Sequence, residues 1–144
     1  MAITAARQRA VARPLDGLDL AGIGFFRITV ADLAAGADIT ARAEFVCPFP
    51  LEILEAKIVP IAASTGVDGS NTVAVTLSNI TGSATIASLT STADYAANTP
   101  LALTLTAANV NCAGDDVLGI AVTQGATADT AGFYVQVFYR PRAL

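Results

Sequence analysis

The sequence predicts an all-β protein, and three observations support that prediction. Apolar and polar residues alternate with a period of two in several short stretches, as in strands that bury one face. Loops rich in Gly, Asn, Asp and Thr separate these stretches. No run of about ten residues or more shows a helical period. Eight strands in two sheets match a jelly roll, so we expect an eight-stranded antiparallel β-sandwich, jelly-roll-like, with an extended N-terminal arm.

The arm is expected over residues 1–24 and the β-sandwich domain over 25–144. The arm is rich in Gly and Asp near its end and shows no sustained period. It carries Arg7, Arg9 and Arg13 before its first acid, Asp16. A basic arm on an acidic body suits an acidic partner surface. A solvated tail is the competing interpretation.

The first three strands are expected at 25–30, 39–47 and 51–61. Each has one apolar side, and Pro48 and Pro50 separate the second strand from the third because proline cannot donate to a ladder. The residues expected to point inward are Phe26, Ile28, Val30, Ile39, Ala41, Ala43, Phe45, Cys47, Leu54, Ala56 and Ile58.

The other five strands are expected at 72–79, 84–91, 101–106, 117–124 and 133–140. The stretch 84–91 has the weakest alternation. The inward residues of the other four are Val73, Val75, Leu77, Leu101, Leu103, Leu105, Leu118, Ile120, Val122, Phe133, Val135, Val137 and Tyr139.

The last strand has aromatic rings on both sides. Tyr134 and Phe138 fall on the side that should meet solvent. We expect a second subunit or a neighbouring arm to cover them, and cover by the chain's own residues 14–24 is the alternative. Arg140 and Arg142 would then place charge at the rim of this surface.

The composition suggests burial between subunits. The chain is 53% hydrophobic and only 14% charged, against a usual charged share of about 25%. The residues expected on outer faces are mostly Thr, Ala and Gly, where a solvated sheet usually carries Lys and Glu. Together these features favour a symmetric oligomer or docking on a larger lattice.

Charge and hydropathy narrow the choice of partners. The net charge is −4 and the sequence pI is about 4.5, which disfavours nucleic acid. No apolar run approaches the roughly 18 residues of a membrane span, and the basic start lacks the apolar segment of a secretory signal. We therefore expect no membrane partner.

The chain has few residues that could act in catalysis or bind a metal. We therefore expect it to be no enzyme and to hold neither a cofactor nor a metal. The chain has no His, and its two cysteines lack metal-ligand spacing. Without a secretory signal, Cys47 and Cys112 are expected to be free thiols, and a bridge would need the fold to bring them together. Lys57 should pair with the neighbouring acid Glu55. Gly-Asp-Asp at 114–116 and Asp68 to Asn71 fit turns better than calcium ligands.

Four segments in order resemble small structural proteins of tailed bacteriophages, in particular the decoration (cement) proteins of the head. They are AEFVCPFPLEILEAKIV (43–59), NTVAVTLSNITGSATIASLT (71–90), NTPLALTLTAANVNCAGDDVLGIAVTQGAT (98–127) and VQVFYRP (135–141). With the preceding strand the resemblance covers about residues 25–141.

The resemblance implies a structural virion protein that binds the outside of the head lattice as an oligomer and stabilises it. Its partners would be the major capsid protein and further copies of itself, as a homotrimer. It would be made in the host cytoplasm and end on the outer surface of the capsid. The candidate contact residues are Arg7, Arg9, Arg13, Tyr134, Phe138, Arg140 and Arg142.

Three alternatives stay open. The chain could be a single-jelly-roll capsid subunit, a tail or fibre component, or a carbohydrate-binding β-sandwich. Sugar sites usually present exposed aromatic platforms, and Tyr95 is the only loop aromatic after Pro50. The sequence contains no Trp, which weakens the carbohydrate alternative.

Overall fold

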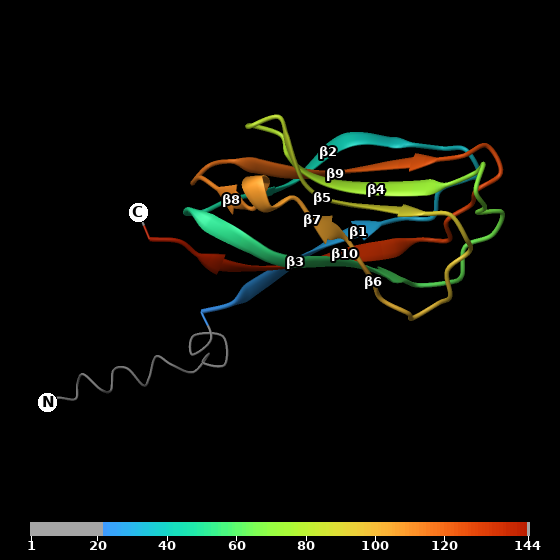
Figure 1. Cartoon of the computed structure of the whole chain (residues 1–144), viewed down its shortest axis with the longest axis horizontal. Helices are drawn as coiled ribbons and strands as arrows, with labels where there is room; N and C mark the ends of the chain where they lie inside the picture. The colour runs from blue at the N-terminus through green and yellow to red at the C-terminus, as the bar shows by residue number, and fades with distance from the viewer. Residues whose placement is uncertain (1–21, 144) are drawn as a thin grey trace, which may run out of the picture.

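Two antiparallel sheets packed face to face make up the part of the chain that this computed structural model describes, residues 22–143 (Figure 1). The predicted all-β class is confirmed. The strands are β1 (Gly24–Val30), β2 (Ile39–Val46), β3 (Leu51–Pro60), β4 (Val73–Asn79), β5 (Ala84–Ser91), β6 (Leu101–Ala102), β7 (Thr104–Leu105), β8 (Asn111–Cys112), β9 (Val117–Gln124) and β10 (Phe133–Pro141). A short 3₁₀ helix, η1 (Ala107–Asn109), lies between β7 and β8.

The strand order is that of a jelly roll. One sheet has the order β1-β10-β3-β6, with β8 also paired to β3, and the other has the order β2-β9-β4-β5-β7. Among the long strands, the first pairs with the last and the second with the last but one, down to the β4–β5 hairpin. Every connection except that hairpin passes from one sheet to the other. The chain is thus a long hairpin rolled into two sheets.

Residues 22–143 contain ten strands where the sequence predicts eight. The difference arises at 101–106, which the fold divides at Leu103. β6 pairs with β3 in the first sheet, and β7 pairs with β5 in the second. Between them Leu103 is buried, and its N–H donates to the Ala56 carbonyl at 2.8 Å. The segment therefore changes sheets at Leu103, and the two-residue strand β8 follows after η1.

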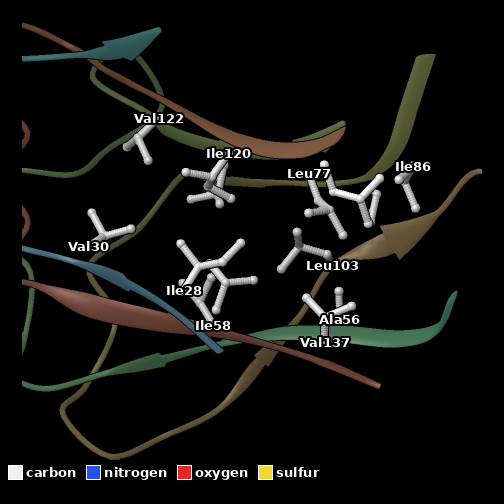
Figure 2. Packing of buried hydrophobic residues seen from close by; sticks show 14 of the residues in the cluster. Ile28, Val30, Ala56, Ile58, Leu77, Ile86, Leu103, Ile120, Val122 and Val137 are labelled. Atoms are coloured by element: carbon white, nitrogen blue, oxygen red, sulfur yellow. The ribbon is translucent and has the colours of Figure 1, made fainter. Parts of the chain in front are cut away.

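The core lies between the two sheets. Figure 2 shows Ile28, Ile58 and Val137 of the first sheet facing Leu77 and Ile120 of the second. All the predicted inward residues of β4 and β9, and Phe133, Val135 and Val137 of β10, are at most 1% exposed. Strict alternation in these strands places each second side chain in the core.

The alternation predicted for 39–47 is wrong over most of the strand. Ala41 and Ala43 are exposed, and Ile39 and Phe45 are only half-buried, so Cys47 is the one fully buried member. Two register shifts against β9 cause this, and Ala41 has a positive φ of 35° at the first. Each β-bulge inserts a residue that changes which face the next side chains meet.

β3 has one bulge that overturns the prediction for Leu54. Leu51 and Ile53 are buried, as are Ala56 and Ile58, while Leu54 is only half-buried. The register against β10 shifts between Phe138 and Tyr139, which leaves Leu54 as the extra residue. The bulge lets both halves of a ten-residue strand bury their apolar side.

Candidate interaction surface

The outer face of β1, β10 and β3 carries three rows of side chains, one residue from each strand. The register places Phe25 beside Phe138, Arg27 beside Gln136 and Thr29 beside Tyr134. On the other side of β10 the matching residues are Glu55, Lys57 and Val59. We call this surface the aromatic face and define it by Phe25, Arg27, Lys57, Tyr134 and Phe138. Tyr134 and Phe138 point outward, as predicted.

Residues of the neighbouring strands lie against the two outward rings of β10. The Arg27 guanidinium lies 4.7 Å from the centre of the Tyr134 ring, and the Lys57 ammonium lies 5.9 Å from that of Phe138. Phe25 packs on Phe138 with ring centroids 6.0 Å apart. These contacts leave Tyr134 and Phe138 half-buried, while Phe25 stays 58% exposed. β1 and β3 of the chain itself therefore provide part of the cover over these rings.

Two of the five predicted contact arginines, Arg140 and Arg142, lie in the described part of the chain. Arg140 pairs with Glu52 of β3 at 2.8 Å, and Arg142 is exposed just beyond β10, where its N–H donates to the Pro50 carbonyl at 2.9 Å. Both lie at the end of the sandwich where β10 ends and β1 begins (Figure 1). Arg7, Arg9 and Arg13 lie outside the described residues.

A second aromatic group occupies that same end of the sandwich. Phe26 and Phe45 stack with ring centroids 4.0 Å apart, and Tyr139 lies 6.2 Å from each. Phe49 extends the group, 6.4 Å from Tyr139, and is itself 39% exposed. Gly24 makes room for it, since a Cβ there would lie 2.6 Å from the Tyr139 ring. This group closes the core and continues its apolar surface to the outside.

Sequence reasoning missed Phe25 and Phe49 as surface residues. Phe25 begins an alternating strand, so the available signal was the pair Phe25–Phe26, of which one ring must face outward in a strand. Phe49 sits between two prolines, and a residue there has no periodicity from which a direction could be predicted.

The outer face of β9, β4 and β5 is different in chemistry. Its rows are Thr90–Ala74–Thr123, Ser88–Thr76–Ala121 and Thr85–Ser78–Gly119. We call it the threonine face and define it by these nine residues. Gly119 lies on this outer face, but Ile80 folds over it and buries it. A shallow pocket lies at the β4–β5 hairpin. Its lining residues are Ala41, Ser78, Asn79, Ile80, Ser83, Ala84 and Thr85.

The acidic loop residues Asp68 and Asp116 accept hydrogen bonds that stabilise turns, as predicted. The Asp116 carboxylate accepts hydrogen bonds from the Asn79 amide at 2.6 Å and from the Ala113 N–H at 2.8 Å. Asp68 accepts from the N–H groups of Ser70 and Asn71, and these bonds lower its pKa. The Lys57–Glu55 pair is also confirmed, at 3.2 Å.

Tyr95 is not a surface platform. Its side chain is only 6% exposed, and its N–H donates to the Ser64 hydroxyl at 2.9 Å. Burial, with Asp94 and Asp129 nearby, raises the pKa of Tyr95 to about 12. The loop aromatic considered for sugar binding is therefore part of the interior.

Residues 22–143 contain no helix long and apolar enough to cross a membrane. Within that same part of the chain, no three His, Cys, Asp or Glu side chains gather as metal ligands would.

Comparison with known proteins finds weak structural similarity only. No protein-family model matches the chain, and no curated protein matches it at a significant level. A structure described as Bacillus endospore appendages, a family of disulfide-linked pili, is similar with a TM-score of 0.41 and 13% identity over 83% of this chain and 89% of that one. A structure of infectious bursal disease virus is similar with a TM-score of 0.34 and 12% identity over 84% of this chain and 37% of that one. Similarity this weak does not establish a function for this chain.

Proposed function

We propose that this chain is a structural protein of a virus particle that binds the outside of a phage head as an oligomer and stabilises it. The observation that carries the proposal is the aromatic face. Phe25 is 58% exposed at the edge of a rigid sheet, beside the half-buried rings of Tyr134 and Phe138. A contiguous exposed apolar patch rimmed by polar residues is typical of an interaction site.

The chemistry of the aromatic face suits a protein partner. Aromatic residues and Arg are enriched where interfaces concentrate their binding free energy, and the face offers Tyr134 and Phe138 with Arg27 beside them. The rings are held by cross-strand contacts, so little conformational entropy is lost when a partner covers them.

Binding in many copies fits this arrangement. A symmetric lattice presents the same contact repeatedly, and a trimer engages several contacts at once. Modest affinity at each aromatic face would then add up to firm attachment. The major capsid protein is the proposed partner on the head, and further copies of this chain are the proposed partners within the oligomer.

A binding experiment tests the proposal directly. Purified protein is incubated with expanded, undecorated heads of its phage, the heads are sedimented, and the bound protein is quantified and imaged by electron microscopy. The mass in solution gives the oligomeric state. We expect the wild type to cover the heads and the double variant Phe25→Ser/Phe138→Ala to bind at least tenfold more weakly.

A matched control on the other sheet is Thr76→Ser/Thr123→Ser, which should bind like the wild type. A wild type that leaves the heads bare would refute the decoration role. A Phe25→Ser/Phe138→Ala protein that is folded and binds undiminished would remove the aromatic face from the contact.

The strand order supports one second candidate, a single-jelly-roll capsid subunit, because viral capsid domains share this architecture. The same experiment separates the two. A capsid subunit should assemble into closed shells without added heads, whereas a decoration protein should remain a small oligomer until heads are present.

A further inference from the structure

Cys47 and Cys112 are far apart in the sequence but meet in the core. Both are free and buried, each with no exposed surface. The two thiols are close enough for each to shift the pKa of the other, and the Cys112 sulfur lies 4.0 Å from the Val110 carbonyl oxygen. Sequence reasoning left a bridge open on the condition that the fold brings the cysteines together, and the structure meets that condition.

The backbone on both sides of this pair is fixed by hydrogen bonds. The Cys47 N–H donates to the Asp116 carbonyl at 2.9 Å, and the Asp115 N–H donates to the Cys47 carbonyl at 2.8 Å. Cys112 lies in β8, in register with Leu51 of β3. The segment after β2 is therefore tied directly to the segment that follows Cys112, and the contact does not depend on the position of a free loop.

We propose that Cys47 and Cys112 are a disulfide-forming pair whose oxidation staples the β2–β3 connection to β8. The oxidant is a small-molecule disulfide. The thiolate of one cysteine attacks it and forms a mixed disulfide, releasing one small thiol. The thiolate of the other cysteine then attacks the protein sulfur of that mixed disulfide and releases the second small thiol. The protein loses two protons and two electrons, and the small disulfide is reduced to two thiols.

Burial determines when this reaction runs. Desolvation raises the pKa of Cys47 to about 12 and that of Cys112 to about 11, with the negative charge of Asp116 adding to both. The reactive thiolate is therefore scarce in the folded protein, and the oxidant has no access to it. The bridge should form while the chain folds or opens locally at β8, and should then persist.

The bridge would connect distant parts of the chain. It closes a loop of about 65 residues, which lowers the entropy of the unfolded chain and raises the melting temperature by roughly 10 °C. Such a staple suits a protein exposed on the outside of a particle, where surroundings are oxidising. That last point rests on the proposed function, whereas the bridge itself does not.

Thiol counting on the full chain tests the inference. The protein is refolded in a buffer of reduced and oxidised glutathione, acid-quenched, unfolded, alkylated with iodoacetamide and weighed intact. We expect no alkylated cysteine and a mass lower than that of the reduced chain by two hydrogen atoms. The single variants Cys47→Ala and Cys112→Ala are matched controls that cannot form the bridge within one chain.

Thermal unfolding provides the second readout. The refolded wild type should melt roughly 10 °C above the same protein reduced with dithiothreitol, and neither single variant should show that difference. Two alkylated cysteines in the refolded wild type, or loss of thiols through dimers between chains, would overturn the pairing. A bridged protein that melts no higher than the reduced one would overturn the stapling. The wild-type thiol count decides the pairing even where a variant fails to fold.

Discussion

The two outer faces of the sandwich are built on the same scaffold and have opposite chemistry. On each, three rows of side chains cross a central strand, β10 on the aromatic face and β4 on the threonine face. The inner residues Val73, Val75 and Leu77 of β4 and Phe133, Val135 and Val137 of β10 are all at most 1% exposed. Only the outward residues differ, with rings and cations on one sheet and Ser, Thr, Ala and Gly on the other.

The difference between the two faces indicates which of them can bind a partner tightly. Large rings such as Phe138 remove much apolar area from water when a partner covers them, while Thr and Ala remove little. Small side chains instead allow close approach, as Ile80 shows by lying against Gly119. The aromatic face is thus suited to anchor a partner, and the threonine face to pack its own loops closely.

The largest effect is expected from filling that close approach with Gly119→Ala. A Cβ at this position would lie 2.6 Å from the Arg42 carbonyl oxygen, which is backbone of β2 and cannot rotate away. We expect the free energy of unfolding to fall by about 2 to 3 kcal/mol, measured by urea denaturation. Ala121→Ser, in the next row of the same strand, should stay within about 0.5 kcal/mol. If Gly119→Ala and Ala121→Ser both lost only a small and similar amount of unfolding free energy, the threonine face would not depend on close packing.

The second-largest effect is expected in the core between the two sheets, where the buried Cys47 thiol makes stability depend on pH. The fold holds the pKa of Cys47 at about 12, whereas a thiol of the unfolded chain ionises near pH 8.5. The protonated thiol is therefore the form that the fold favours. Its contribution to stability is complete below about pH 8.5 and is lost as the pH rises toward the folded value.

Between pH 7 and pH 10 we expect Cys47 alone to account for a loss of about 2 kcal/mol of unfolding free energy in the reduced protein. Urea denaturation with dithiothreitol present measures it. The Cys47→Ala variant should lose less unfolding free energy over the same pH interval. Substitutions on the aromatic face or the threonine face should leave the loss unchanged. A stability that is level across this range would contradict the burial of neutral thiols.

A smaller effect is expected on the aromatic face from Arg27→Gln. The variant keeps a polar side chain but removes the cation that lies 4.7 Å from the Tyr134 ring. A double-mutant cycle with Tyr134→Leu should give a coupling of about 0.5 to 1 kcal/mol. The corresponding cycle of Thr76→Ala and Ser88→Ala on the threonine face should give none. A coupling on both faces, or on neither, would remove the energetic contrast between them.

The smallest effect is expected at the rim of the aromatic face, from Glu52→Gln. This change breaks the 2.8 Å pair with Arg140, whose side chain is 56% exposed. Solvent and salt screen such a pair, so the loss should be about 0.5 kcal/mol or less and should vanish in high salt. A loss above about 1 kcal/mol would show that this rim pair is shielded from solvent.

Sequence reasoning worked best in the central strands and failed at edges and irregularities. The inward residues of β4 and β9 and the outward direction of Tyr134 and Phe138 were predicted because central strands alternate without interruption. Leu54 and Ala41 were assigned to the wrong environment because each sits at a bulge. Of the candidate contact residues, Tyr134 and Phe138 lie together on one face with Arg140 at its rim. Phe25, their most exposed neighbour, was not predicted because only strand pairing places it beside Phe138.

The sequence by itself determined the fold class and the two-sided character of the long strands, since a period of two depends only on neighbouring residues. It also determined that the last strand carries rings on its outer side. The tertiary structure alone decided where β2 and β3 bulge, where residues 101–106 change sheets, and that Cys47 meets Cys112. Those features depend on the register between segments far apart in the chain, and no local pattern records that register.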